Sequence, residues 1–145
     1  MRVLLQRVAR AAVTVDQQPL SRIGAGLLVL IGIAQGDGEV DADRLATKTL
    51  ALRIFPDSAR AMNRSVVDVN GEVLVVSQFT LTADTRRGNR PGFTTSAPPA
   101  VAQALYERYV AQIRAGLGRV ATGRFGADMQ VELVNDGPVT FLLES

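Results

Sequence analysis

The sequence predicts a single α/β domain over residues 1–145, with a sheet covered on one side by two main helices. A length of 145 residues is typical of one domain. Aliphatic runs of strand length, such as GLLVLIGIA at 26–34, alternate with two segments whose apolar residues repeat every three or four positions. The expected order of elements is ββ-(βα)2-βββ, which is an α/β arrangement.

In the N-terminal half, residues 2–15 and 26–34 are expected to be strands, joined by the turn-rich segment QQPLSRIGAG. The acidic segment GDGEVDAD suits the start of a helix, because carboxylates favour the positive end of the helix dipole. We expect that helix to run from about residue 41 to residue 54 and to end before Pro56.

In the C-terminal half, the sequence VLVVSQFTL at 73–81 predicts a buried strand, followed by a long loop at 82–97. A second helix is expected behind Pro98 and Pro99, where a first helical turn tolerates proline. Its apolar stripe consists of Val101, Leu105, Tyr109, Ile113 and Leu117. Strands are expected at 128–133 and 139–143, with a turn at NDGP between them.

The composition limits the chemistry that the protein can use. Its 47% hydrophobic and 21% charged residues are ordinary for a soluble domain, and the net charge is only +2. The chain has no cysteine and no histidine, which excludes a Ser-His-Asp triad, a cysteine nucleophile and zinc or haem ligation by these residues. Catalysis would depend on carboxylates, hydroxyls, the single lysine, backbone amides or the substrate, and no metal or cofactor is expected.

Two further features concern location and partners. No apolar run approaches the roughly 18 to 20 residues that span a bilayer, and the arginines in MRVLLQRVAR interrupt any signal-peptide core. We therefore expect a cytoplasmic protein without a membrane partner. Arg86, Arg87 and Arg90 gather in the long loop, where they suit either phosphate binding or plain solvation.

The tetrapeptide Ser77, Gln78, Phe79 and Thr80 places polar groups at the end of an aliphatic strand. Backbone amides near Phe79 and Thr80 would suit an oxyanion wherever the strand leaves the sheet. The alternative is a plain strand end whose hydroxyls cap the backbone. A nucleophilic role for Thr80 is disfavoured because no histidine or nearby lysine can act as its base, although Asp84 could in principle serve.

The second polar stretch is NDGPVT, residues 135–140. Asp-Gly between two strands is a strong hairpin signal, so a simple turn is one interpretation. The other uses Gly137 and Pro138, because an X-Pro bond tolerates the cis form and glycine removes side-chain obstruction. Such a turn would present two carbonyl oxygens in a fixed orientation.

Together SQFT, RRGNRPGF, GRFGADM and NDGPVT, in this order, resemble the D-aminoacyl-tRNA deacylases, the D-tyrosyl-tRNA deacylase family. The similarity covers essentially the whole chain from MRVLLQRV onward. The resemblance implies hydrolysis of the ester that joins a D-amino acid, or mischarged glycine, to the terminal adenosine of tRNA. Backbone amides and the ribose 2′-hydroxyl would support the reaction without a metal or cofactor.

The resemblance also implies roles for individual residues. Ser77, Gln78, Phe79 and Thr80 would form the catalytic pocket. In a homodimer, the turn at Gly137 and Pro138, braced by Arg7, would enter the partner's pocket and exclude L-amino acids. The implied substrate-binding residues are Phe93, Phe125, Met129, Val139 and Thr140, although Phe125 and Met129 also suit plain core packing.

The chain departs from the family pattern at one position, where Gly92 replaces the more usual serine in NRPGF. Two other functions stay open. The first is a noncatalytic tRNA-binding module of the same fold, and the second is an esterase for small D-amino esters that does not require RNA.

Overall fold

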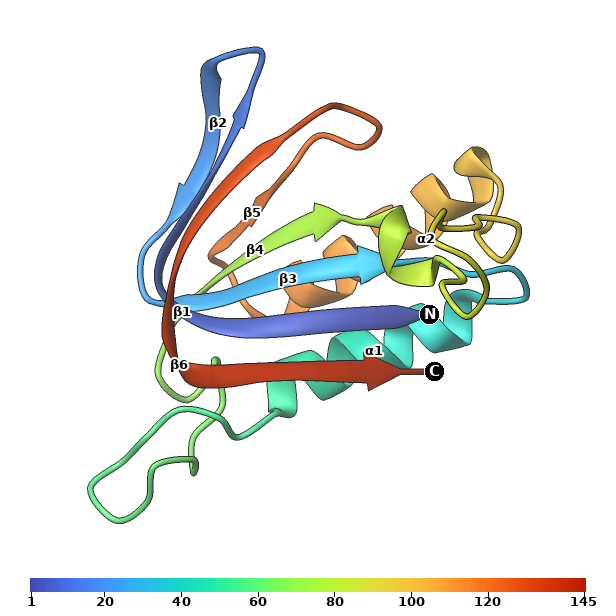
Figure 1. The fold of residues 1–145 in the computed structure, drawn as a ribbon. Coiled ribbons are helices and arrows are strands. Elements are labelled where there is room, and N and C mark those ends of the chain that lie inside the picture. Colours follow the sequence, from blue (N-terminus) through green and yellow to red (C-terminus); the bar gives the residue numbers. More distant parts are fainter.

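The computed structural model describes all residues from 1 to 145 as one domain built on a six-stranded mixed sheet (Figure 1). Two α-helices and one 3-10 helix complete the fold. The elements in chain order are β1 (Arg2–Val15), β2 (Gln18–Ile23), β3 (Gly26–Gly32), α1 (Glu39–Ala51), β4 (Glu72–Ser77), η1 (Phe79–Thr82), α2 (Pro99–Gly116), β5 (Val120–Thr122) and β6 (Gln130–Glu144).

Strand β1 organises the sheet, because it pairs with three other strands. The order is β2-β1-β3-β4-β5, and β6 also pairs with β1. The long strand β1 bends so that its first half pairs with β3 and its second half with β2, while β6 follows it along both halves. The pairs β3–β4 and β4–β5 are parallel, so the carboxyl ends of these three strands lie at one edge of the sheet.

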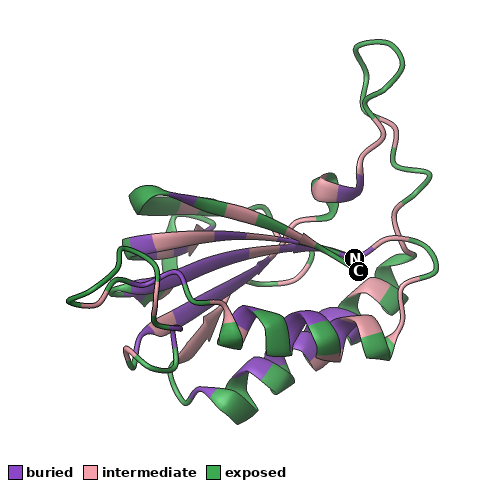
Figure 2. Cartoon of the chain, turned by 90° about the horizontal axis from the view of Figure 1, so that it is seen from below, coloured by how far each residue is buried: buried purple, intermediate pink, exposed green.

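The main core lies between the sheet and the two helices, which cover one face of the sheet (Figure 2). Leu27, Val29, Val73 and Val75 are fully buried there because β3 and β4 carry aliphatic residues on both faces. A smaller apolar cluster fills the opposite face between the bent parts of β1, β2 and β4. No helix is long and apolar enough to cross a membrane.

The predicted α/β class and the helical cover on one side are confirmed, and several segments differ in detail. Residues 18–23, expected within a turn-rich connection, form strand β2. Asp16 and Gln17 both adopt positive φ, at 51° and 62°, which gives the two-residue turn that the twist of a hairpin favours. The strand expected at 73–81 ends at Ser77, and residues 79–82 form η1.

The C-terminal segment differs most from the expected pair of strands. In place of the strands expected at 128–133 and 139–143, the chain forms one continuous strand, β6, which begins at Gln130, and NDGP does not reverse the chain. Residues 136–138 instead form an irregular bend, where the register between β1 and β6 shifts on both sides of Val8. The short strand β5, which no pattern in the sequence indicated, extends the sheet beyond β4.

Both helices occur close to their expected positions. Helix α1 spans 39–51, so it ends three residues earlier than expected, and the chain is already extended at Leu52. In α2 the apolar stripe is buried except for Val101, which lies in the first turn and is 45% exposed.

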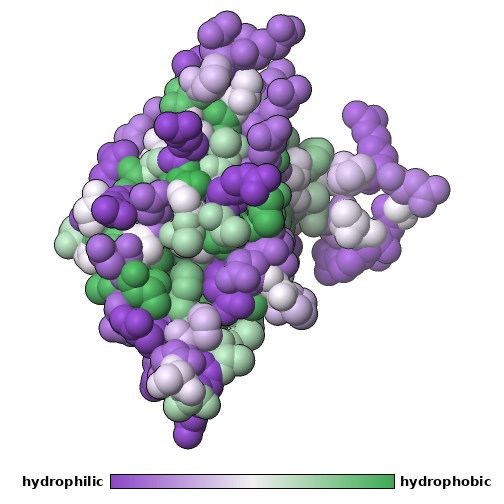
Figure 3. Space-filling model, turned by 90° about the vertical axis from the view of Figure 1, so that its left-hand side faces the viewer, coloured by the Kyte–Doolittle hydropathy of each residue, from purple (hydrophilic) through white to green (hydrophobic).

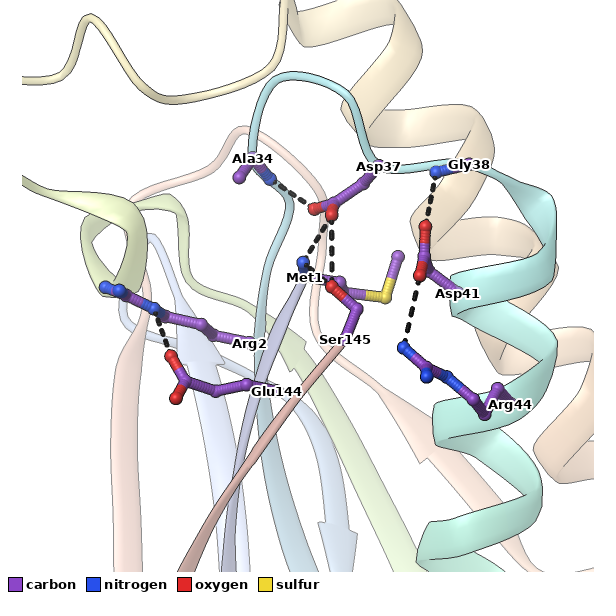
Figure 4. Close-up of polar contacts among 9 residues, drawn as sticks. All are labelled: Met1, Arg2, Ala34, Asp37, Gly38, Asp41, Arg44, Glu144 and Ser145. Atoms are coloured by element: carbon purple, nitrogen blue, oxygen red, sulfur yellow. Dashed lines mark hydrogen bonds and ion pairs between the residues drawn. The ribbon is translucent and has the colours of Figure 1, made fainter.

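The two chain ends lie side by side and are joined through Asp37 (Figure 4). The α-amino group of Met1 forms an ion pair with the Asp37 carboxylate and donates a hydrogen bond of 2.6 Å to the hydroxyl of Ser145. Asp37 also accepts a hydrogen bond of 2.6 Å from the amide of Ala34. This cluster fastens the loop before α1 to the ends of β1 and β6.

Two tyrosines of α2 are buried against the sheet and α1. The hydroxyl of Tyr106 donates to the carbonyl of Val75 at 3.0 Å, and the hydroxyls of Tyr109 and Thr49 are hydrogen bonded at 2.7 Å. Burial raises the pKa of Tyr106 from 10.0 to about 12 and raises the pKa of Tyr109 further, although its bond to Thr49 opposes that shift.

These tyrosines predict a loss of stability at alkaline pH. The folded pKa values exceed the unfolded value of 10.0, so the stabilisation is complete below pH 10 and is lost as the pH rises from 10 toward 12. Each tyrosine contributes a slope of at most about 1.4 kcal/mol per pH unit to the free energy of unfolding. Urea denaturation between pH 8 and 11.5 measures this slope. The Tyr106→Phe variant should show a shallower slope, and an unchanged slope would contradict the assignment to Tyr106.

Candidate active site

A pocket of about 570 Å³ lies at the carboxyl ends of the parallel strands β3 and β4. Open α/β sheets bind ligands at this edge, because the chain leaves the sheet there and exposes its backbone. The segment 125–131 and the start of α2 close the sides of the pocket. Of the residues singled out in the sequence, the structure brings together here Ser77, Gln78, Phe79, Phe125 and Met129.

The strand end at Ser77 and Gln78 supplies the polar side of the pocket. The Gln78 amide still bonds to the carbonyl of Ile31 at 2.8 Å, which is the last sheet contact before the chain turns into η1. The amides of Phe79 and Thr80 begin this 3-10 turn, and the turn itself offers them no acceptor. Two adjacent N–H donors therefore lie at the end of β4, beside the pocket.

The hydroxyl of Thr80 is exposed and accepts a hydrogen bond of 2.5 Å from the Gln78 side chain. Asp84, which could in principle act as a base for it, is engaged elsewhere: its two carboxylate oxygens accept from Arg86 at 2.9 and 2.8 Å. These bonds hold the pKa of Asp84 well below its usual range, so this carboxylate is a weak base. Asp84 is therefore a poor candidate for the base that would activate Thr80.

The long loop expected at 82–97 forms an arm, which we define as residues 84–92. The backbone amides and carbonyls of Asp84 and Gly92 close its base at 2.8 and 2.9 Å. The arm extends away from the body of the protein (Figure 2), and its surface is hydrophilic (Figure 3). Just after the arm, the ring of Phe93 packs on Phe79 with centroids 5.0 Å apart, so Phe93 borders the pocket through Phe79.

The bend at 136–138 contains the cis peptide bond expected between Gly137 and Pro138. Arg7 donates to the carbonyl of Asp136 at 3.0 Å and forms an ion pair with its carboxylate at the same distance. A second bond from Arg7 reaches the carbonyl of Ile54 at 2.5 Å. The bend is therefore tied through Arg7 to the segment after α1.

Asn135 holds the bend from the other side, and the sequence motif gave this residue no role. Its side-chain amide donates to the carbonyl of Arg7 at 2.9 Å and to that of Val139 at 3.1 Å. It thereby bridges β1 and the residue that follows Pro138. The only signal for Asn135 in the sequence was its place beside Asp136 and Gly137, which is equally typical of a turn residue.

Within one chain the bend does not reach the pocket. In the sheet register, Arg7 of β1 lies opposite Leu27 of β3, whereas Ser77 of β4 lies opposite Ile31, four residues further along β3. At about 3.3 Å per residue this is a separation of roughly 13 Å along the sheet. Two implied substrate-binding residues also lie outside the pocket: Val139 is buried in the main core, and Thr140 accepts a bond from Gln6 at 3.2 Å.

Most of the remaining pocket wall is apolar, with Ser96 and Asp128 as its polar members, and none of these wall residues had a predicted role in a site. Ile31 and Ile33 continue the aliphatic run of β3, while Ala97, Ala102 and Val131 come from three other segments. Such residues cannot be told from ordinary core by their pattern, because a pocket wall and a core face have the same hydrophobic period.

Comparison with known proteins agrees with this architecture. The model of the D-Tyr-tRNA(Tyr) deacylase family matches residues 4–144. D-aminoacyl-tRNA deacylases from Ruegeria pomeroyi and Cereibacter sphaeroides are each 58% identical to the chain, and the alignments cover 99% and 100% of both sequences.

Two solved structures share the fold. A c-Myc DNA unwinding element binding protein superposes with a TM-score of 0.94 at 40% identity, covering 100% of this chain and 99% of its own. A probable eukaryotic D-amino acid tRNA deacylase has a TM-score of 0.84 at 20% identity, covering 98% and 97%, which supports the fold alone. From the family model and these whole-length relatives, the chain belongs to the D-Tyr-tRNA(Tyr) deacylase family.

Proposed function

We propose that the protein hydrolyses the ester bond between a D-amino acid and the 3′-terminal adenosine of tRNA. The observation that carries this proposal is the pocket at the end of β4, which Ser77, Gln78 and Phe79 line together with Phe125 and Met129 in a chain of the deacylase family. The products are free tRNA and a D-amino acid. The reaction would remove D-residues before they enter protein, in the cytoplasm where translation occurs.

The backbone at the start of η1 would hold the ester carbonyl. As the carbonyl oxygen becomes an oxyanion, the amides of Phe79 and Thr80 would donate hydrogen bonds to it, and each such donor is worth about 3 to 4 kcal/mol of transition-state stabilisation. The ribose 2′-hydroxyl of the substrate would position the attacking water. A side-chain nucleophile is unnecessary in this scheme, which fits the absence of histidine and cysteine.

The apolar side of the pocket would receive the terminal adenine. Phe125 offers a ring face and Met129 a polarisable thioether, and both are half-buried in the pocket wall. Unpaired bases at nucleic-acid ends are commonly bound by stacking on such side chains. Phe93 and Phe79 would border the opposite side, where the amino acid lies.

A homodimer would bring the bend at 136–138 to the pocket, since the two are separated within one chain. The exposed apolar residues Leu133 and Val134 flank this bend on β6 and suit burial by a second copy, and Figure 3 shows hydrophobic groups on that side of the molecule. The carbonyls of Gly137 and Pro138 from the second copy would block an L side chain and admit the hydrogen of a D-residue. Glycine has no side chain to exclude, so glycyl-tRNA would also be a substrate.

The decisive test compares D-tyrosyl-tRNA with L-tyrosyl-tRNA in the presence of a chelator. We expect release of D-tyrosine and sparing of the L-ester. A D-tyrosyl ester without adenosine should react poorly, whereas a general esterase would cleave it as well as charged tRNA. Equal rates on both mirror-image esters of tRNA would refute the proposal.

The Thr80→Ala variant tests the assignment of catalysis to the backbone. Because the amide of residue 80 survives the substitution, we expect kcat within about tenfold of wild type, which is less than the 10² to 10³ lost with an oxyanion donor. Single-turnover deacylation measures the rate, and circular dichroism checks the fold. Complete loss of activity in a folded variant would instead make the hydroxyl a participant in the chemistry.

A second candidate function is a noncatalytic nucleic-acid-binding module of the same fold. It is favoured by the 40% identity to a c-Myc DNA unwinding element binding protein and by the exposed arginines of the arm, Arg87 and Arg90. This alternative predicts salt-sensitive binding of tRNA without turnover. The deacylation test above distinguishes the two functions directly.

A further inference from the structure

A second, smaller pocket adjoins the candidate active site on the far side of Phe125. We call this space of about 360 Å³ the side pocket. It lies between α2 and the segment that follows β5, and its walls include Tyr106, Glu107, Arg114 and Arg124. Phe125 lines both this pocket and the candidate active site, so the two spaces share one aromatic wall.

The side pocket contains two arginines without a carboxylate partner. Neither Arg114 nor Arg124 has an acidic group within 4 Å, whereas Arg108 of the same helix is paired with both Glu39 and Asp43. The one carboxylate in the wall, Glu107, accepts a hydrogen bond of 2.9 Å from Gln103. The balance of the lining is therefore positive, and both guanidinium groups are exposed to solvent.

The position of these charges matters more than their number. Arg124 directly precedes Phe125 in the chain, and Arg114 comes from the last turns of α2 on the same side. A nucleoside whose base stacks on Phe125 has its 5′-phosphate attached on the sugar, beside the ring and outside the base pocket. Arginine is well suited to such a group, because its planar donors match the oxygens of a phosphate.

We propose that the side pocket binds the phosphodiester that joins the terminal nucleoside to the preceding nucleotide, through Arg114 and Arg124. This inference rests on the proposed function, which supplies the nucleoside in the neighbouring pocket. It assigns these arginines to substrate binding and gives them no part in the chemistry. The pocket thereby distinguishes a polynucleotide end from a free aminoacyl nucleoside.

The test uses two substrates, D-aminoacyl-tRNA and the D-aminoacyl ester of adenosine, which has no phosphate. For the double variant R114A/R124A we expect KM for the tRNA substrate to rise about tenfold or more, corresponding to the loss of charge-assisted bonds. Because a bond to this phosphate is equally present in the ground and transition states, kcat should not change. Both constants for the adenosine ester should equal those of wild type.

Charge-conserving and distant substitutions provide the controls. The R114K/R124K variant keeps the positive charges and should recover most of the affinity, whereas Arg60→Ala, an exposed arginine in the loop after α1, should behave as wild type. The slope of log KM against log salt should fall by about 0.7 for each phosphate that the variant no longer neutralises. R87A/R90A tests the arm as the competing phosphate site.

Several outcomes would overturn the inference. The first is an unchanged KM of R114A/R124A for the tRNA substrate, and the second is an equal rise in its KM for the adenosine ester. The third is a loss of affinity for tRNA that occurs only in R87A/R90A. If the wild-type protein cleaves neither ester, the proposed function itself fails. Binding of uncharged tRNA to the same variants then still decides whether Arg114 and Arg124 hold a phosphate, because that measurement requires no turnover.

Discussion

Gly137→Ala should remove most of the discrimination between D- and L-aminoacyl esters while leaving ester hydrolysis measurable. A β-carbon at residue 137 would lie 2.1 Å from the Oδ1 atom of Asn135 and 2.8 Å from the amide of Val139. The Asn135 side chain must therefore leave its bonds to the carbonyls of Arg7 and Val139. The bend then loses the bridge that fixes its carbonyl oxygens. In the proposed mechanism these oxygens exclude L side chains by shape, so their displacement should impair selection.

A misplacement of about 1 Å in a positioning element costs on the order of 100-fold, so we expect the D-to-L ratio of kcat/KM to fall by about that factor. The measurement is the ratio of deacylation rates on the two tyrosyl-tRNA esters. Gly118→Ala is the matched control, because a β-carbon there meets nothing within 4 Å. An unchanged ratio in a folded Gly137→Ala variant would mean that the bend does not select between the mirror-image substrates.

Gly26→Ala should have the largest effect on stability. Gly26 opens β3 opposite Glu72 of β4, and a β-carbon at this position would lie 1.8 Å from the Glu72 carbonyl oxygen and 2.7 Å from its carbonyl carbon and nitrogen. These atoms belong to the backbone of a buried parallel pair, so no side-chain rotation relieves the overlap. The strands must separate at the start of the β3–β4 pair, next to the fully buried Leu27 and Val73.

We expect Gly26→Ala to lower the free energy of unfolding by about 4 kcal/mol or more, beyond the usual range for a single substitution. The melting temperature should fall by about 10 °C or more. Thermal unfolding followed by circular dichroism measures both. Gly24→Ala lies two residues away, where a β-carbon would meet only the Glu72 side chain at 3.7 Å, and it should be nearly neutral. Similar losses in both variants would contradict the backbone clash as the cause.

The elements that the sequence predicted correctly are those whose pattern is local. The aliphatic runs of β3 and β4 and the period of α2 identify buried elements whatever their partners are. The segment NDGP shows the opposite case, since its residues are typical of a hairpin, yet pairing with β1 on both sides keeps β6 continuous. Strand β2 was missed because the two-residue turn before it consists of Asp16 and Gln17. It lacks the glycine that usually marks such a turn in a sequence.

The residues of the candidate site also divide into those that a local pattern predicts and those that depend on strand pairing. Ser77 to Phe79, Phe125 and Met129 line one pocket because parallel strands bring their carboxyl ends to one edge, which the order of elements already indicates. The positions of Val139 and Thr140 depend on the register of β6 against β1, which no local pattern encodes. Of the side-pocket arginines, Arg124 belongs to the stretch GRFGADM, but Arg114, ten residues before it, belongs to no motif, so only the folded chain brings the two together.

The dependence of the sheet on β1 has a consequence for folding during synthesis. Strand β1 is synthesised before the other strands of this sheet, whereas β6, which pairs with it along both halves, is synthesised after them. Until then one side of β1 has no partner, and closing so long a loop is a slow step. Until β6 is synthesised, the nascent chain therefore carries an open strand edge, which is a template for pairing with other chains.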